Sequence, residues 1–315
     1  MANPSPTDIK VSIQAALGNF ATLPLLAATR NLFSVLGYTS PRNESILRIA
    51  TVDDFLGWLA GAGKQGLLSA KDQNDLRSGL PSLHFLFQLT DDEIKAAIGP
   101  AQASLFDSGT AVDGLQMHSY LVFAAQLPAD APCTRSNLVR LVRLINKPLP
   151  MPALILFRQD DSLTLAVINR RPHKRENAKD VLEKVTLIKD INCITPHRAH
   201  LDILGDLALI RLQEKYVFTN FDGLHLAWQK TLDTTELNKR FFQEIANWYF
   251  WAIKKVKYPN PHNLIEQHNH SLNVIRLLTR LIFCWFLKEK KLLPEALFNQ
   301  AELAKICIAK HLHEI

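Results

Sequence analysis

The sequence is poor in cysteine and glycine, and both shortages exclude whole classes of function. Only 4 of its 315 residues are cysteine and none forms a C-x-x-C pair, so we expect neither a disulfide framework nor a cysteine zinc site. The 12 glycines form neither G-x-G-x-x-G nor a P-loop, which argues against the common nucleotide sites. The G-x-S-x-G signature of nucleophile-elbow hydrolases is also absent.

The sequence also lacks an uninterrupted apolar run long enough to cross a membrane. Its amino terminus, MANPSPTDIK, has neither the basic start nor the apolar core of a signal peptide. The most apolar late segment, LLTRLIFCWFLKEKK, is interrupted by Arg280. Because 47% hydrophobic and 21% charged residues are typical of soluble globular proteins, we expect a cytoplasmic protein with no membrane partner.

Positive charge is in modest excess, with 36 Lys/Arg against 30 Asp/Glu and a net charge of +6. The excess is densest in residues 157–190, FRQDDSLTLAVINRRPHKRENAKDVLEKVTLIKD, where two strand-like runs flank a cationic turn. Guanidinium and ammonium groups supply the phosphate contacts that dominate nucleic-acid affinity. We therefore predict DNA contact by the four cations of this turn, Arg170, Arg171, Lys174 and Arg175. A solvated surface turn is the alternative explanation.

The pattern of the chain predicts a mixed α/β (α+β) fold in three regions. Residues 1–115 are expected to be mostly helical, residues 116–195 to form an α/β core, and residues 196–315 to be helical again. Within the core, the strand candidate HSYLVFAAQL, the helix SNLVRLVRLINK and the buried strand PALILF follow one another closely. This order favours a sheet layer flanked by helices.

Three local features refine this prediction. Thr90 is expected to cap a helix that has acidic residues in its first turn, and Ser136 to cap the helix of the core. In the core helix, Arg140 and Arg143 lie three residues apart and share one face, which makes them a second candidate pair for phosphate contact. The late helix NWYFWAIKKVKY is rich in aromatics; burial against several neighbours explains them more simply than base stacking.

A metal-dependent nuclease would need two carboxylates and a lysine at strand ends to hold Mg²⁺. Weak candidates are Asp160 and Asp161 at a strand start, with Glu183 and Lys184 near the last strand. Glu183 and Lys184 lack the acid-x-Lys spacing, as do Lys189 and Asp190, and adjacent residues of a strand face opposite sides. Mg²⁺ is therefore expected only if the chain is an active nuclease, and no other cofactor or metal is expected. A simple turn explains the two aspartates equally well.

Several long segments carry a family resemblance. They are LILFRQDDSLTLAVINRRPHKRENAKDVLEKVTLIKDI, TPHRAHLDILGDLAL, WQKTLDTTELNKRFFQEIANWYFWAIKKV and LTRLIFCWFLKEKKLLPEALF. Together with FLFQLTDDEI they resemble the amino-terminal region of bacterial single-chain, adenine-specific DNA methylases of the type IIG restriction-modification class. The resemblance covers the chain from about residue 30 to about residue 300.

This resemblance implies a nuclease-like fold for the sheet and a methylase domain after the helical segment that begins at Asp233. The chain has no glycine-rich cofactor turn and no Asn-Pro-Pro-aromatic segment, so we expect a stand-alone or truncated amino-terminal portion without methylase motifs. Gln126 and Pro128 stand where a nuclease of this kind would want an acid and a lysine, which puts cleavage in doubt.

Three hypotheses follow. The first is a DNA-associated module of a restriction-modification or phage-defence system. The second is a Mg²⁺-dependent endonuclease of the PD-(D/E)xK type. The third is an interaction scaffold whose helical carboxyl third docks a separate methylase domain or subunit.

Overall fold

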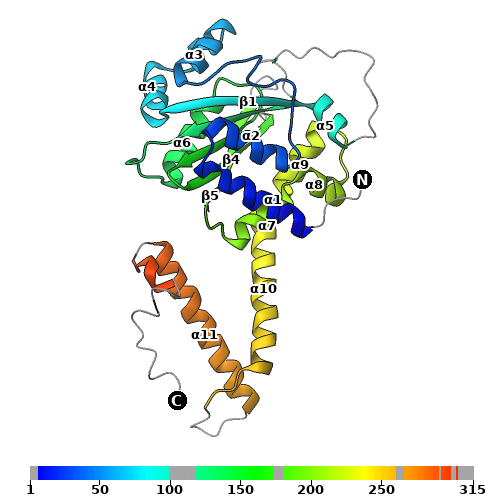
Figure 1. Ribbon diagram of the computed structural model, residues 1–315, viewed down its shortest axis with the longest axis vertical. Helices are drawn as coiled ribbons and strands as arrows, with labels where there is room; N and C mark the ends of the chain where they lie inside the picture. The colour runs from blue at the N-terminus through cyan, green and yellow to red at the C-terminus, as the bar shows by residue number, and fades with distance from the viewer. Residues whose placement is uncertain are drawn as a thin grey trace. The chain divides into compact units, whose positions relative to one another are not determined.

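The computed structural model of the chain describes residues 6–98, 112, 118–172, 180–259, 266–290, 292–298 and 303. It divides into two compact units, Met1–Asp233 and Thr234–Ile315. The first unit contains a mixed five-stranded sheet flanked by helices (Figure 1), which confirms the predicted fold class. The domain boundaries expected near residues 115 and 195 both fall inside this unit.

The sheet has the strand order β1-β2-β3-β4-β5. Its strands are β1 (Ser82–Thr90), β2 (Ser119–Gln126), β3 (Ala153–Gln159), β4 (Ser162–Pro172) and β5 (Asp180–Asn192). Only β2 and β3 are parallel, and the other neighbours are antiparallel. A parallel pair needs a crossover connection, which helix α6 (Arg135–Asn146) supplies. The strand-helix-strand order predicted for the core is therefore present.

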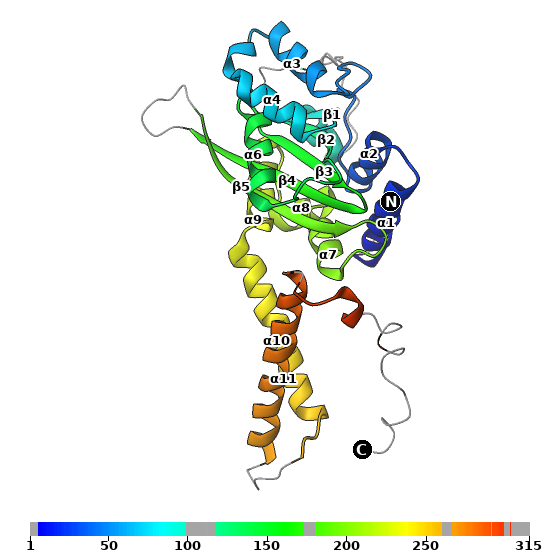
Figure 2. The ribbon, with the colours of Figure 1, turned by 90° about the vertical axis from the view of Figure 1, so that its left-hand side faces the viewer.

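Helices cover both faces of the sheet (Figures 1 and 2). One apolar core includes residues of α1 (Pro6–Gly18), α2 (Leu25–Val35), α7 (Arg198–Asp206), α8 (Leu209–Tyr216) and α9 (Phe221–Thr231). The other core includes residues of α3 (Val52–Gly61), α4 (Ala70–Gly79) and α6. This three-layer arrangement lets both sides of each central strand become buried.

Strand β1 lies within the region that the sequence predicted to be mostly helical. Leu83 and Phe85 pack into one core, whereas Phe87 and Leu89 pack into the other, because the register shifts between Phe85 and Phe87 and reverses the faces of the strand. Because both faces are buried, the strand lacks the polar alternation that would have revealed it. Residues 42–50 run along its outer edge and exchange backbone hydrogen bonds with it, which protects that edge from pairing with other chains.

The two predicted helix caps had different outcomes. Helix α5 (Asp91–Ile98) follows Thr90 directly, and the Thr90 N–H donates to Glu93 Oε2 at 2.8 Å, as expected of a capping-box residue. For α6 the prediction of Ser136 was wrong. Thr134 is the N-cap, and its Oγ1 accepts from the Asn137 N–H at 3.3 Å, because the helix begins at Arg135.

The second unit contains the helices α10 (Thr234–Lys255) and α11 (Glu266–Glu289), followed by the short 3₁₀ helix η3 (Glu295–Phe298). The two long helices meet where Tyr249 Oη lies 2.5 Å from Ser271 Oγ, and the nearby Ala252 and Val274 are buried. Away from this contact many aromatic and aliphatic side chains are exposed, so the prediction that the aromatics of α10 are buried was wrong. Exposed members are Phe241, Phe242, Trp248, Phe250, Trp251, Leu281, Ile282, Phe283, Trp285 and Phe286.

One helix of the described chain, His268–Lys288, is long and apolar enough to cross a membrane by length and composition. It passes this test although Arg276 and Arg280 lie within it. The same length and composition suit a helix that packs against another protein. The first unit has the layered architecture of a soluble α/β domain.

Candidate nucleic-acid interface

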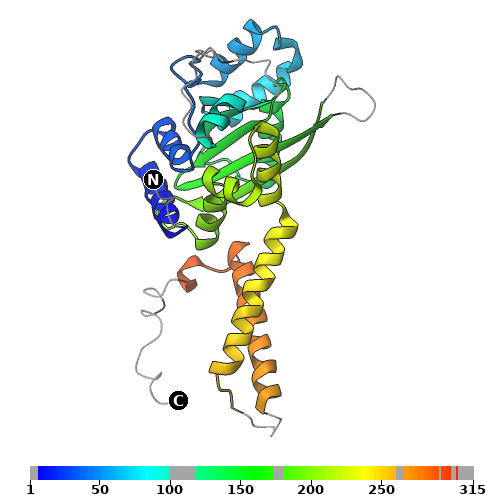
Figure 3. The ribbon, with the colours of Figure 1, turned by 90° about the vertical axis from the view of Figure 1, so that its right-hand side faces the viewer.

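The sheet ends in a two-stranded projection, which we call the ribbon. Strand β3 stops pairing with β4 at Ala166, whereas the pairing of β4 with β5 continues to Pro172. Residues 167–172 and 180–186 therefore have no neighbour on the β3 side. Figures 2 and 3 show this hairpin extending past the ends of the other strands. A two-stranded β-ribbon has dimensions that fit the major groove of B-form DNA.

The predicted phosphate-contacting residues fall on or next to this ribbon. Arg170 and Arg171 belong to β4 and pair with Leu182 and Val181 of β5. Lys174 and Arg175 lie outside the described residues. From residue 167 to residue 186 the sequence has six Lys/Arg against three Asp/Glu. This stretch of sequence, part of which lies outside the described residues, therefore has a net charge of +3.

A β-bulge interrupts the ribbon near its base. Beyond the pair of Ile168 with Val185, β5 places two residues, Glu183 and Lys184, opposite the single residue Asn169 of β4. Such a bulge bends the strand, increases its twist and re-aims side chains. Lys184 is exposed, so this bend adds a solvent-facing ammonium group to the base of the ribbon.

The four candidate nuclease residues do not come together. Asp160 and Asp161 are exposed and form the turn between β3 and β4, with Asp160 at a positive φ of 50°, as the alternative turn interpretation predicted. This turn adjoins the Ser162 end of β4, which pairs with Asn192 at the far end of β5. Lys184 is eight residues from Asn192, which at ~3.3 Å per residue amounts to about 25 Å.

The described part of the chain has no cluster of three or more His, Cys, Asp or Glu residues that could hold a metal ion. Gln126 is aligned with Arg158 in the parallel pair of β2 and β3. The end of that strand therefore carries an amide where a metal-dependent nuclease would need a carboxylate. The described geometry offers no common site for Mg²⁺.

The second cationic pair lies on α6, away from the ribbon. Arg140 Nη1 is 2.5 Å from Asp75 Oδ2 of α4, and about two helical turns later Lys147 Nζ is 2.8 Å from Asp72 Oδ2. The hydrogen bond from Lys147 is the main cause of the lowered pKa of Asp72. These ion pairs tie α6 to α4. Both arginines of the predicted pair are exposed, but Arg140 is engaged by Asp75, which leaves Arg143 as the better candidate for phosphate contact.

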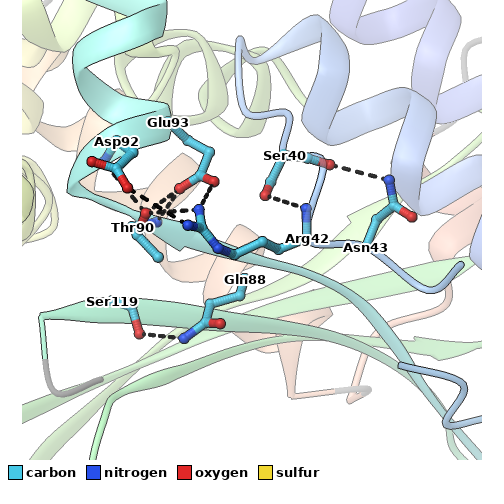
Figure 4. Close-up of polar contacts among 8 residues, drawn as sticks. All are labelled: Ser40, Arg42, Asn43, Gln88, Thr90, Asp92, Glu93 and Ser119. Carbon is cyan, nitrogen blue, oxygen red and sulfur yellow. Dashed lines mark hydrogen bonds and ion pairs between the residues drawn. The ribbon is translucent and has the colours of Figure 1, made fainter. Parts of the chain in front are cut away.

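A buried ionic cluster that the sequence did not reveal surrounds Arg42 (Figure 4). Its guanidinium pairs with the Glu93 carboxylate, and its Nη1 donates to Thr90 Oγ1 at 3.2 Å. Arg42 and Glu93 are each only 7% exposed. Next to them, Gln88 Nε2 donates to Ser119 Oγ at 3.0 Å. Because these groups satisfy one another within the core, we interpret the cluster as a structural clamp between residues 40–43 and α5.

A second polar network lies between β2 and α9. The Tyr120 hydroxyl is hydrogen-bonded to His225 Nδ1, and Gln229 Nε2 lies 2.8 Å from His225 Nε2. Burial lowers the pKa of His225, although the Asp222 carboxylate opposes the shift. A neutral ring that accepts the Gln229 amide hydrogen at Nε2 carries its own hydrogen on Nδ1, which we assign from this network. The network therefore fixes the orientation of the Gln229 amide.

No family model, curated protein or solved structure matches the chain. The evidence for a function therefore comes from the residues and the fold.

Proposed function

We propose that this protein is a DNA-binding module that holds duplex DNA through the ribbon. The observation that carries the proposal is the coincidence of the densest cationic segment with a two-stranded projection from the sheet. A cationic turn within a compact surface could be only a solvating feature. A cationic ribbon that leaves the sheet instead presents both its backbone and its charges to a groove.

The resemblance to restriction-modification methylases supports placing this module in the bacterial cytoplasm, in a restriction or phage-defence system. On this proposal DNA is the partner and the chain itself needs no cofactor. Arg170, Arg171, Lys174 and Arg175 contact phosphates, and Arg143 is a secondary contact. The endonuclease alternative is less well supported, since Asp160 and Asp161 lie at the opposite end of the hairpin from Glu183 and Lys184.

The test is the salt dependence of duplex binding, measured by fluorescence anisotropy with the full chain. The variant changes Arg170, Arg171, Lys174 and Arg175 together to alanine. Each lost phosphate contact lowers the slope of log K against log salt by about 0.9, so the slope should fall by up to ~3.6. Unchanged binding at low salt would contradict the proposal.

A matched control removes the same charge from elsewhere on the first unit. Four exposed cations off the ribbon are suitable: Arg48, Lys71, Lys95 and Lys215. Their joint replacement by alanine should leave the slope nearly unchanged. If both quadruple variants lose the same amount of slope, binding follows net charge alone and the ribbon has no special role.

A second candidate function, docking of a protein partner, is favoured by the exposed apolar side chains of α10 and α11. Contiguous exposed apolar surface marks interaction sites. The second unit, residues 234–315, also carries 12 Lys/Arg against 7 Asp/Glu, which is five of the six net charges of the chain. An apolar partner surface bordered by carboxylates fits these features, and the methylase domain or subunit implied by the resemblance is the proposed occupant.

This second candidate is tested with the methylase-domain polypeptide of a type IIG enzyme supplied as a separate chain. Replacing Phe283 and Trp285 by serine should weaken its binding at least tenfold in calorimetry, because aromatic anchors dominate interfaces. The control replaces Val11 and Leu23, exposed apolar residues of the first unit, and should leave affinity unchanged. Equal affinity of the wild type, the Phe283 and Trp285 variant and the control variant for the methylase domain would exclude the docking function.

A further inference from the structure

A polar cavity of about 230 Å³ lies at the base of the ribbon, within the first unit. It is lined by Val167, Lys184, Thr186, Gln229, Leu232 and Asp233. None of the expectations drawn from the sequence assigned a ligand to this place, although Lys184 was a weak nuclease candidate.

The register of β4 and β5 explains how the strand side of the cavity forms. Val167 is paired with Thr186, and Lys184 lies two residues from Thr186, on the same face of the strand. Val167 and Leu232 both belong to the core between the sheet and α9, so they provide the apolar wall. The bulge at Lys184 then bends the strand at the cavity rim.

The helix side of the cavity is held in a fixed orientation. Gln229 lies in α9 and donates one amide hydrogen to His225 Nε2. The His225 ring is in turn hydrogen-bonded to the Tyr120 hydroxyl. Tyr120 is 1% exposed and anchored in the core. Gln229 has no other hydrogen bond with the described residues, so its second amide hydrogen is available at the cavity. A side chain fixed in this way can bind a ligand without losing conformational freedom.

We propose that this cavity binds a phosphodiester group of DNA held by the ribbon. Three groups donate hydrogen bonds to its oxygens: the Lys184 ammonium, the Thr186 hydroxyl and the Gln229 amide. The Lys184 ammonium also supplies the positive charge that balances the phosphate. The Asp233 carboxylate also lines the cavity and opposes the anion, so it limits the affinity. This inference rests on the proposed function, because the ligand belongs to the DNA that the ribbon binds.

The first experiment measures binding of a 20-base-pair duplex to the full-length Lys184→Gln variant. Lys184 is exposed, so the change keeps the fold, which a thermal melt verifies. We expect about fivefold to twentyfold weaker binding near 0.1 M salt and a salt slope smaller by about 0.9. Thr186→Val, which removes only the hydroxyl, should weaken binding about twofold to fivefold. The matched control is Lys71→Gln, an exposed lysine off the ribbon, which should change affinity less than twofold.

The second experiment uses the opposing carboxylate. Asp233→Asn should tighten duplex binding severalfold, and by more than Asp130→Asn, which removes an exposed carboxylate elsewhere. Equal effects of the two substitutions would overturn the assignment of Asp233 to a phosphate site. Inorganic phosphate at matched ionic strength is the second probe. If it binds the wild-type chain while Lys184→Gln leaves duplex affinity unchanged, the cavity holds a free anion and the proposal fails.

The two proposals fail in distinguishable ways. If the quadruple ribbon variant loses its salt slope while Lys184→Gln and Thr186→Val bind like wild type, the ribbon function stands and the cavity inference is wrong. If the cavity variants weaken binding while the ribbon variant does not, the cavity contacts DNA and the ribbon assignment is wrong. Binding that is unaffected in all variants refutes both.

Discussion

The guanidinium of Arg42 and the carboxylate of Glu93 form a buried ion pair between residues 51 positions apart in the sequence. The same carboxylate accepts a hydrogen bond from the Thr90 backbone N–H. The Glu93 side chain therefore stabilises the first turn of α5 and pairs with Arg42 at the same time. The Arg42 carbonyl in turn accepts the Gln88 N–H at 2.8 Å. The pair thus fastens the segment that covers the free edge of β1, and loss of either partner should expose that edge.

Replacement of Arg42 by methionine should lower the free energy of unfolding by about 3–5 kcal/mol, because it leaves the Glu93 carboxylate buried without its cation. Urea unfolding of the purified chain measures the change. The double replacement with Glu93→Leu should cost less than the single one, since no buried charge then remains. Arg48→Met, at an exposed position, is the control. A loss below about 1 kcal/mol for Arg42→Met would show that the pair is not a clamp.

Tyr38→Phe should cost about 1–3 kcal/mol of stability. The Tyr38 hydroxyl donates to the Leu207 carbonyl at 2.6 Å and accepts the Trp228 indole N–H at 2.9 Å, and both groups would be left without this partner in the core. Thermal unfolding monitored by Trp fluorescence measures the effect. Tyr258→Phe, a tyrosine of the second unit, is the comparison and should be close to neutral. Equal melting curves for Tyr38→Phe and wild type would contradict the assigned role.

Stability should fall as the pH drops below about 6.5. Burial lowers the pKa of His225 and of His84 in the folded chain, whereas both titrate near 6.5 when unfolded. The unfolded chain therefore takes up protons first, so stability is at its full value above pH 6.5 and is lost as the pH falls from 6.5 through the lower pKa values of the folded chain. Urea unfolding between pH 7.5 and pH 5 measures the slope. His225→Gln should reduce this slope, and an unchanged slope would remove His225 from the explanation.

The turn of Asp160 and Asp161 should tolerate glycine at its first position. Asp160 has a positive φ of 50°, a conformation that glycine adopts without steric cost, while a β-branched residue is strained there. Asp160→Gly should keep or slightly raise the melting temperature, and Asp160→Val should lower it. Duplex affinity should be the same in both, because the turn lies at the opposite end of β4 from the ribbon. A loss of plasmid cleavage in Mg²⁺ by Asp161→Ala would instead support the endonuclease alternative.

Local sequence signals predicted the elements that depend on neighbours along the chain. The apolar runs of β2 and β3 with α6 between them were visible because each has its own periodicity and boundary residues. Thr90 was visible because an N-cap and the acidic first turn after it span only four residues. Strand β1 was missed because it is buried on both faces, and contacts between distant segments leave no local signal either. The Leu209 N–H, for example, donates to the distant Leu36 carbonyl at 2.8 Å.

By itself the sequence determined the α/β class, the cationic segment and the lack of the common catalytic signatures, because composition and short spacings carry that information. Only the tertiary structure decided which charges are placed together. Strand register separated Asp160 and Asp161 from Lys184 and placed Val167 opposite Thr186, and helix packing brought Gln229 to the same cavity. The partner of Arg42 was likewise fixed by the fold, since contacts between residues far apart in sequence leave no local pattern.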